Sequence, residues 1–174
     1  VMSDSTPSIK LRTAYADLSE SYRTKRDKIN FSIDTHEKRI AYIIARMPAT
    51  FHAVSHVLEK IPAQNNAQAL SVLDIGTGPG TALWALAEKF PNIKQMIAIE
   101  QNAHMQALAK KLSQNHPILK NTEWITGNIL TSQAQIPHAD LVIASYMLNK
   151  VPTHAQIPLL ELLWQLATHT LILI

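Results

Sequence analysis

A short apolar segment, residues 71–75, runs directly into three glycines at alternating positions: Gly76, Gly78 and Gly80. Asp74 stands two residues before the first of them. Glycine adopts positive φ at little cost and lets the backbone approach a ligand closely, so the spacing predicts a loop that binds a nucleotide-type cofactor. A dinucleotide fingerprint, G-x-G-x-x-G, would need its third glycine where Thr81 stands. The alternative is a tight turn between a strand and a helix.

A second acidic residue, Glu100, follows another apolar segment, residues 95–99. A carboxylate at the tip of the second strand can accept hydrogen bonds from both hydroxyls of a ribose, and it disfavours a 2′-phosphate. We therefore expect Glu100 to bind the cofactor's ribose. The alternative is a solvated strand end.

Periodicity places these residues in an α/β chain. Apolar residues at helical spacing in 11–26 and 36–47, a break or kink at Pro48, and a further helical stretch at 51–61 predict an N-terminal helical extension over 1–62. Over 63–174, strands are predicted at 71–75, 95–99, 122–126, 140–145 and 170–174, with helices at 80–90, 102–114 and 155–168. This alternation predicts a Rossmann-like parallel sheet of order 3-2-1-4-5.

The composition narrows the class of protein. With 174 residues, 47% of them hydrophobic and 17% charged, the chain is long enough for one Rossmann-like domain and its core. No apolar run approaches the roughly 18 residues of a membrane span, and no cleavable leader is evident, so we expect a soluble, cytoplasmic protein with no membrane partner. The absence of cysteine excludes disulfides, thiolate metal sites and cysteine nucleophiles. His52 and His56 project away from the expected apolar stripe, and no metal site is predicted.

The net charge of +3 includes one local cluster of basic residues: Arg23, Lys25, Arg26 and Lys28. Such a cluster can contact the phosphates of a nucleic acid. A solvated helix end explains it equally well. Trp84 and Trp164 fall among alanines and leucines of predicted helices, so we expect core packing for them, not platforms for base stacking. The oligomeric state is not indicated.

Several segments share a pattern with one family: Leu18–Arg23, Ala41–Tyr42, Ala45–Thr50, Leu73–Trp84, Ala139–Val142 and Ser145–Asn149. Gly-Pro-Gly-Thr at 78–81 and Arg-Met-Pro-Ala-Thr at 46–50 are the most specific. In these segments the chain resembles the class I S-adenosylmethionine (SAM)-dependent methyltransferases. Within them it resembles the methyltransferase-like family associated with the small ribosomal subunit in bacteria and mitochondria. The resemblance implies action on ribosomal RNA or on the small subunit during assembly.

The resemblance also implies a set of cofactor-binding residues: Asp74, Gly76, Gly78, Gly80, Glu100, Gln101, Asn128, Ile129 and Ser145. Asp74 would hold the methionine ammonium of SAM directly or through water, and the glycines would let the backbone pass beside the methionine and ribose. Asn128 would accept a hydrogen bond from the adenine amino group. The alternative for Asn128 is a turn asparagine bonded to its own backbone.

No catalytic residue is identified. The segment Ser145–Asn149 lacks the Asn/Asp-Pro-Pro-aromatic motif of exocyclic-amine methyltransferases. Tyr146 would be able to stack on a substrate base and Asn149 to accept a hydrogen bond, although a buried tyrosine with a satisfied hydroxyl is the commoner situation. Lys150 stands where the family pattern tends to an acid.

Family members usually continue past the fifth strand with a Glu-Pro-Gly-type turn and a cysteine-bearing segment linked to an iron–sulfur cluster. This sequence has neither and does not support that cluster. We also expect the antiparallel hairpin that normally completes the sheet to be missing. Three functions stay open: a SAM-dependent methyltransferase, a non-catalytic SAM-binding ribosome assembly factor, and an NAD-dependent oxidoreductase.

Overall fold

The structure, a computed structural model, describes residues 5–24, 35–61, 71–131 and 136–174. The chain divides into two compact units, Val1–Ala49 and Thr50–Ile174. The predicted boundary between residues 62 and 63 lies outside the described residues, as does the part of the basic cluster beyond Arg23.

The N-terminal part of the chain is helical, as predicted. Helix α1 spans Ser5–Thr24 and helix α2 spans His36–Glu59. The predicted break at Pro48 does not occur, because α2 is assigned as one helix with Pro48 inside it; a kink at this position stays a prediction. An interior proline lacks its own N–H donor and its ring crowds the carbonyl four residues earlier, but the helical assignment continues through Pro48 over all 24 residues.

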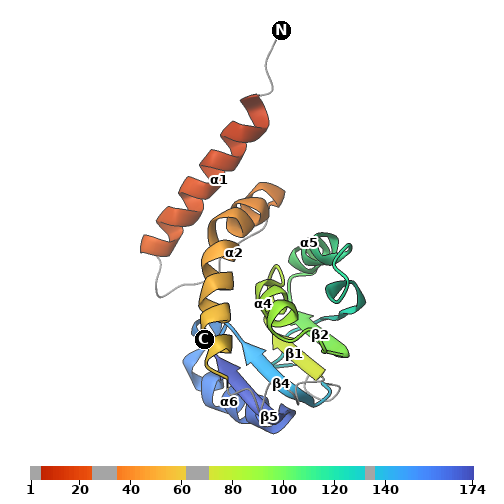
Figure 1. Cartoon of the computed structure of the whole chain (residues 1–174). Helices are drawn as coiled ribbons and strands as arrows, with labels where there is room; N and C mark the ends of the chain where they lie inside the picture. The colour runs from red at the N-terminus through yellow and green to blue at the C-terminus, as the bar shows by residue number, and fades with distance from the viewer. Residues whose placement is uncertain (1–4, 25–34, 62–70, 132–135) are drawn as a thin grey trace. The chain divides into compact units, whose positions relative to one another are not determined.

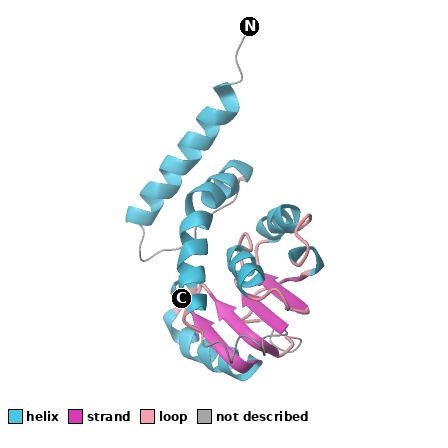
Figure 2. Ribbon diagram, in the orientation of Figure 1, coloured by secondary structure: helices cyan, strands magenta, loops and turns pink. Residues whose placement is uncertain are grey.

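The second unit contains a five-stranded sheet with the predicted order, β3-β2-β1-β4-β5, and every neighbouring pair of strands is parallel (Figure 2). The strands are β1 (Ser71–Ile75), β2 (Gln95–Glu100), β3 (Glu123–Thr126), β4 (Ala139–Ala144) and β5 (Ala167–Leu173). The connecting helices are α4 (Thr81–Lys89), α5 (Ala103–Ser113) and α6 (Thr153–Leu166), with short 3-10 helices η1 (Leu119–Asn121) and η3 (Leu148–Lys150). Most predicted elements differ from these only at their ends.

Each face of the sheet has its own hydrophobic core because successive side chains of a strand point to opposite faces. Val72 of β1 packs in a cluster with residues of α4 and with Val54 and Leu58 from the end of α2. Leu73 and Ile75, the alternate positions of the same strand, pack with buried leucines of α6. Figure 1 shows α4 and α6 on opposite sides of the strands. The sheet is thus covered on both faces, as buried parallel sheets require.

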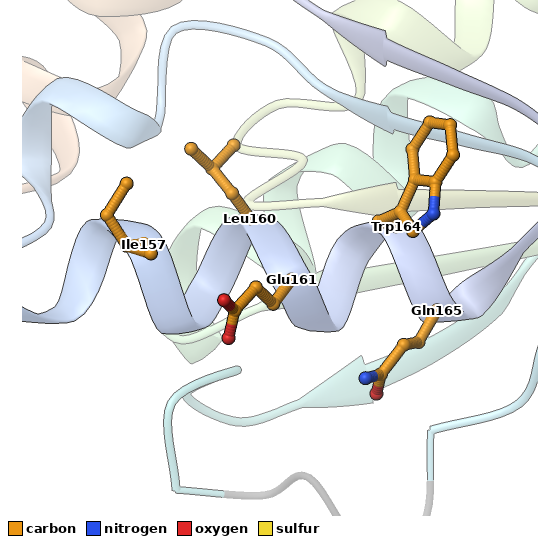
Figure 3. A pocket seen from close by; sticks show the side chains of 5 residues that line it. All are labelled: Ile157, Leu160, Glu161, Trp164 and Gln165. Atoms are coloured by element: carbon orange, nitrogen blue, oxygen red, sulfur yellow. The ribbon is translucent and has the colours of Figure 1, made fainter.

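Helix α6 also departs from the prediction. Leu159, Leu163 and Leu166 face the core, but Trp164 is 72% exposed, so the expected core packing of Trp164 is wrong. A residue next to Leu163 lies about 100° further around the helix, away from the sheet. Figure 3 shows Trp164 along one side of α6 with Ile157 and Leu160. These side chains border a shallow hollow of about 430 Å³ together with Glu161 and Gln165.

Trp84 is half-buried and packs against the core on the α4 side, with its ring edge-on to His116 at 5.0 Å between centroids. Among the described helices, none is long and apolar enough to span a membrane.

Candidate functional site

The loops at the carboxyl end of the sheet are tied to one another by backbone hydrogen bonds. The N–H groups of Gly76 and Thr77, after β1, donate to the carbonyl of Ile99 in β2 at 2.9 and 3.1 Å. The N–H of Gly127, after β3, donates to the carbonyl of Glu100 at 3.1 Å. In open α/β sheets, ligands bind beside the carboxyl ends of the strands. The loops after β1, β2 and β3 therefore meet where the sequence predicted a cofactor.

The three glycines of the loop after β1 all have positive φ, but they face different surroundings. A Cβ on Gly76, at φ +67°, would lie 3.0 Å from Cβ of Met147. A Cβ on Gly80, at φ +83°, would lie 3.5 Å from the ring of Trp124. A Cβ on Gly78, at φ +57°, would meet no described atom within 4 Å. Gly76 and Gly80 thus pack against the protein, whereas Gly78 faces open space.

Asp74 is fully buried at the carboxyl end of β1. The Thr77 hydroxyl donates to its Oδ2 atom, while Oδ1 has no hydrogen-bond partner among the described residues. Desolvation raises the pKa of Asp74 to about 7; the hydrogen bond from Thr77 opposes this shift and the nearby charge of Glu100 adds to it. The site therefore holds an unused acceptor that a buried donor would satisfy.

Glu100 ends β2 and is almost fully buried. Its Oε2 atom accepts the N–H of Gly78 at 2.9 Å, and its Oε1 atom accepts the N–H of Asn102 at 2.8 Å. The carboxylate therefore links the glycine loop to the start of α5. Each carboxylate oxygen can accept more than one hydrogen bond, so both oxygens retain capacity for a further donor.

The loop after β3 carries two of the predicted residues. The side-chain oxygen of Asn128 accepts the N–H of Leu130 at 2.9 Å, which is the local turn that the sequence left open as an alternative. Ile129 is buried in the core on the α6 side of the sheet. Nearby, the Thr126 hydroxyl donates to Oε1 of Gln106 at 2.9 Å, whereas the buried Nε2 of Gln106 has no partner in the described part of the chain.

The loop after β4 presents an exposed aromatic side chain. Tyr146 is 45% exposed, so the alternative of a buried tyrosine is wrong. Its φ of +52° lies in the left-handed region, which is uncommon for residues other than glycine and is found in turns and at functional sites. Its N–H donates to the carbonyl of Ile174 at 2.7 Å. Asn149 is exposed and Ser145 half-buried in the same loop.

Lys150, the last residue of η3, is exposed. Desolvation lowers the pKa of the Lys150 ammonium, and the nearby charge of Glu100 opposes that shift. Gln101, directly after Glu100, is exposed. The charge of Glu100 thus raises the pKa of Asp74 and opposes the lowering of the pKa of Lys150.

Sequence reasoning overlooked Thr77 and Asn102. Asn102 is the N-cap of α5, with its side chain accepting the N–H of Met105 at 3.0 Å, and an asparagine before a helix is a recognisable start signal. Thr77 gives no signal of its own, because its role depends on the turn that brings it to Asp74. No group of three or more potential metal-binding His, Asp or Glu side chains occurs among the described residues.

Solved structures with similar folds are methyltransferases. An O-methyltransferase family protein from Burkholderia thailandensis is 16% identical, with a TM-score of 0.70 over 96% of this chain and 51% of that one. Magnesium protoporphyrin IX methyltransferase from Synechocystis PCC 6803, solved with S-adenosylhomocysteine (SAH), is 20% identical, with a TM-score of 0.60 over 95% of this chain and 70% of that one. The chain thus spans about half the length of the first protein. At such identities the likeness shows the class I methyltransferase fold.

No curated protein matched the sequence. Residues 36–174 match the family described as mitochondrial small ribosomal subunit Rsm22. This match covers most of the chain and confirms the resemblance expected from the sequence. The chain belongs to the Rsm22 family and has the fold of a class I SAM-dependent methyltransferase.

Proposed function

We propose that this chain binds SAM at the carboxyl end of its sheet and acts as a SAM-dependent methyltransferase on ribosomal RNA or on the assembling small ribosomal subunit. Membership of the Rsm22 family supports the ribosomal target. The methyltransferase fold supports the cofactor and the class of reaction.

The observation that carries the proposal is the position of Glu100 beside the glycine loop, with its carboxylate held by the N–H groups of Gly78 and Asn102. One remaining acceptor position on each oxygen matches the two hydroxyls of a ribose diol. Oδ1 of Asp74, which has no partner among the described residues, fits the methionine ammonium. Gly78, which faces open space, leaves room for a ligand. The residues present therefore fit SAM.

When bound, SAM supplies an electrophilic methyl group on a sulfonium, so binding and orientation account for much of the catalysis. In this proposal Asp74 holds the methionine end of the cofactor and Glu100 holds its ribose. The exposed ring of Tyr146, at the exit of β4, supplies a surface on which a nucleobase stacks. Asn149, exposed in the same loop, supplies a hydrogen-bond acceptor.

One observation favours a second candidate, a SAM-binding ribosome assembly factor that does not transfer methyl groups. Glu100 favours the charged form of Lys150 and so opposes the lowering of its pKa, and Lys150 stands where the sequence pattern of the family tends to an acid. A cation at this site opposes the binding of a second cation, and the sulfonium of SAM is such a cation.

Isothermal titration calorimetry with SAM, SAH and NAD tests cofactor binding. We expect the wild-type chain to bind SAM and SAH but not NAD. We expect Glu100→Gln, which keeps the size of the side chain, to weaken binding by about 100-fold or more, because two charge-assisted hydrogen bonds are lost. Glu88→Ala, on the exposed side of α4, is the matched control and should bind as the wild type does.

A folded Glu100→Gln variant with wild-type affinity would contradict the proposed site, and selective binding of NAD would revive the oxidoreductase alternative. Transfer of a labelled methyl group from SAM to small-subunit particles then separates the two remaining candidates. We expect transfer that Tyr146→Ala reduces without weakening SAH binding. Tight SAM binding with no transfer to these particles would favour the non-catalytic assembly factor.

A further inference from the structure

Five lysines lie around the starts of β2 and β3, at the amino end of the sheet. Lys94 immediately precedes β2, and Lys120 belongs to η1, just before β3. Helices α4 and α5 each connect parallel neighbouring strands, so their last turns reach the amino end of the next strand. These last turns contain Lys89, Lys110 and Lys111. We refer to the five residues as the β2–β3 lysines.

The β2–β3 lysines give this part of the surface an excess of positive charge. Four of them are exposed and Lys89 is half-buried. Within the described residues, no salt bridge joins any of the five to an acid. The only acid of the sequence between residues 89 and 122 is Glu100, at the carboxyl end of β2. Glu88 and Glu123, just outside this range, are exposed and offset two of the five positive charges.

The surface is hollowed where β2 begins. Lys94 and Asn121, the neighbour of Lys120, border a hollow of about 140 Å³ whose other lining residues are Ile93, Met96, Pro117 and Ile118. This volume is far below the roughly 300–1,000 Å³ of pockets for drug-sized ligands, so only a small group enters. A hollow with charge of one sign and walls of low dielectric concentrates the electric field. It therefore attracts an anionic group such as a phosphate.

The turn that carries Lys120 is fixed by the structure around it. Nδ1 of His116 accepts the N–H groups of Ile118 and Leu119, both at 3.2 Å, which orders the entry to η1. The ring of His116 also packs edge-on against Trp84 of α4. A surface that is ordered before binding loses less conformational entropy when a partner binds.

The types of residue favour RNA over an acidic protein as the partner. Lysines in the last turn of a helix also stabilise the helix dipole, which is a sufficient reason for those of α4 and α5. It does not account for Lys94, which lies outside any helix, or for Lys120, in a 3-10 helix of three residues. Lysine is depleted at protein–protein interfaces, whereas lysine and amide side chains commonly donate to phosphates. Exposed amides accompany the lysines along the chain: Asn92, Gln95, Gln114, Asn115 and Asn121.

We propose that the β2–β3 lysines form a second RNA-binding surface, which holds backbone phosphates without reading the base sequence. The inference rests on the proposed ribosomal target. β2 has six residues, so the two ends of the sheet are about 20 Å apart. One nucleotide cannot occupy both ends. The surface therefore anchors RNA at a distance from the nucleotide that would accept the methyl group.

Fluorescence anisotropy with the full chain and a labelled single-stranded RNA of about 20 nucleotides, longer than most single-strand binding sites, tests the inference. We expect the double variant Lys94→Gln/Lys120→Gln to weaken binding by about tenfold. The slope of log affinity against log salt should become shallower by about 0.7 for each charge removed. Glu123→Gln, which removes a negative charge at the start of β3, should strengthen binding. A second RNA of the same length and different sequence should bind equally well.

Two matched controls keep or move the charge. Lys94→Arg/Lys120→Arg retains both positive charges and should keep the wild-type affinity and salt slope. Glu161→Gln, an exposed acid of α6 on the other face of the sheet, should change neither. SAH binding should be the same in all of these variants, because the β2–β3 lysines lie at the opposite end of the sheet from the proposed cofactor site.

Wild-type affinity and salt slope in a folded Lys94→Gln/Lys120→Gln variant would overturn the inference, as would a wild-type chain that does not bind the RNA. Binding of a polyglutamate peptide in place of RNA would overturn it too and indicate an acidic protein partner. SAH titration and methyl transfer to small-subunit particles decide the proposed function separately. RNA binding that depends on these lysines, in a chain that binds neither SAM nor SAH, would support the surface and contradict the proposed cofactor site.

Discussion

Two aspartates on neighbouring strands, Asp74 of β1 and Asp140 of β4, show how the two ends of the sheet differ. Asp140, near the start of β4, accepts both the N–H and the hydroxyl of Ser71 at 2.9 Å through Oδ2. Its Oδ1 accepts the hydroxyl of Thr168 at 3.2 Å and lies 3.4 Å from Nδ1 of His169. Asp74, near the end of β1, uses one oxygen for Thr77, and the other has no partner among the described residues.

The difference teaches which end of the sheet is built for stability and which for binding. At the amino end, the acceptors of Asp140 are used by the chain itself, and the hydrogen bonds join β1, β4 and β5. At the carboxyl end, an acceptor on Asp74 is buried and left open, although such groups are usually paired. A carboxyl group that raises the free energy of the folded chain is expected where a ligand completes the interaction.

The largest effect should come from making Asp74 permanently neutral. Its folded pKa is raised from 3.8 to about 7, so the free energy of unfolding falls as the pH rises between these two values. Asp74→Asn imitates the protonated form. At about pH 8 the variant should be more stable than the wild type by up to about 4 kcal/mol, and near pH 4 the two should be equal. Urea unfolding at both pH values measures this.

Because groups remote from this site titrate equally in both proteins, the difference between the two stabilities reports on Asp74 and on its coupling to Glu100. A stability difference that does not change with pH would contradict the assigned pKa. Asp74→Asn should at the same time weaken the binding of SAH, since the ammonium loses its ionic partner.

The opposite result is expected at the amino end. Asp140→Ala leaves the N–H and the hydroxyl of Ser71 without the acceptor that they share and should destabilise the chain by about 2–3 kcal/mol. SAH binding should hardly change, because Asp140 lies at the other end of the sheet. Urea unfolding and calorimetry on the same sample test both expectations. A loss of affinity similar to that of Asp74→Asn would remove the distinction between the two ends.

Gly76 and Gly78, at the carboxyl end of the sheet, allow effects on packing to be measured separately from effects on ligand binding. Gly76→Ala and Gly78→Ala both place a side chain at positive φ, which costs about 1 kcal/mol. Gly76→Ala should cost about 1–2 kcal/mol more, because its Cβ meets Met147 at 3.0 Å, whereas the Cβ of Gly78→Ala meets no described atom. Compared with its effect on thermal stability, Gly78→Ala should have a larger effect on the affinity for SAH than Gly76→Ala has. Equal losses of stability would contradict the different surroundings of the two glycines.

The smallest effect concerns the pH dependence of binding. Since ionised Asp74 is the form that pairs with an ammonium, SAH affinity should rise by about tenfold between pH 6 and pH 8 and then level off. Calorimetry in buffers of different ionisation enthalpy should also detect proton release. Asp74→Asn should show neither property. An affinity that falls over this range would mean that Asp74 binds in its protonated form.

The sheet was predictable because its central strands are short apolar runs between loop residues. The range predicted for β1, residues 71–75, is the observed one. β5 begins earlier than predicted, at Ala167 instead of residue 170, because Thr168 and His169 are exposed polar residues on an edge strand. The prediction that Trp164 packs in the core was wrong because α6 is apolar around much of its circumference. Ile157 is also apolar and exposed, so hydrophobicity alone does not identify the outer face of the helix.

The residue types of the candidate site could be predicted from the sequence, but the hydrogen bonds between these residues could not. The glycine spacing and the acid at the end of the second apolar segment predicted the loop and Glu100 as site residues. The link between Glu100 and Gly78 depends on the register of β1 and β2, which places Ile75 beside Ile99 and cannot be read from either segment alone.

The contact between Trp124 and Gly80 gives the protein a built-in optical probe. The indole lies 3.5 Å from the point where a Cβ on Gly80 would stand, so its excited state is sensitive to any shift of the glycine loop. The exposed indole of Trp164, by contrast, is open to collisional quenchers such as acrylamide. With Trp164 quenched, the remaining emission comes from Trp84 and Trp124, and its Trp124 part follows events at the glycine loop without any attached label.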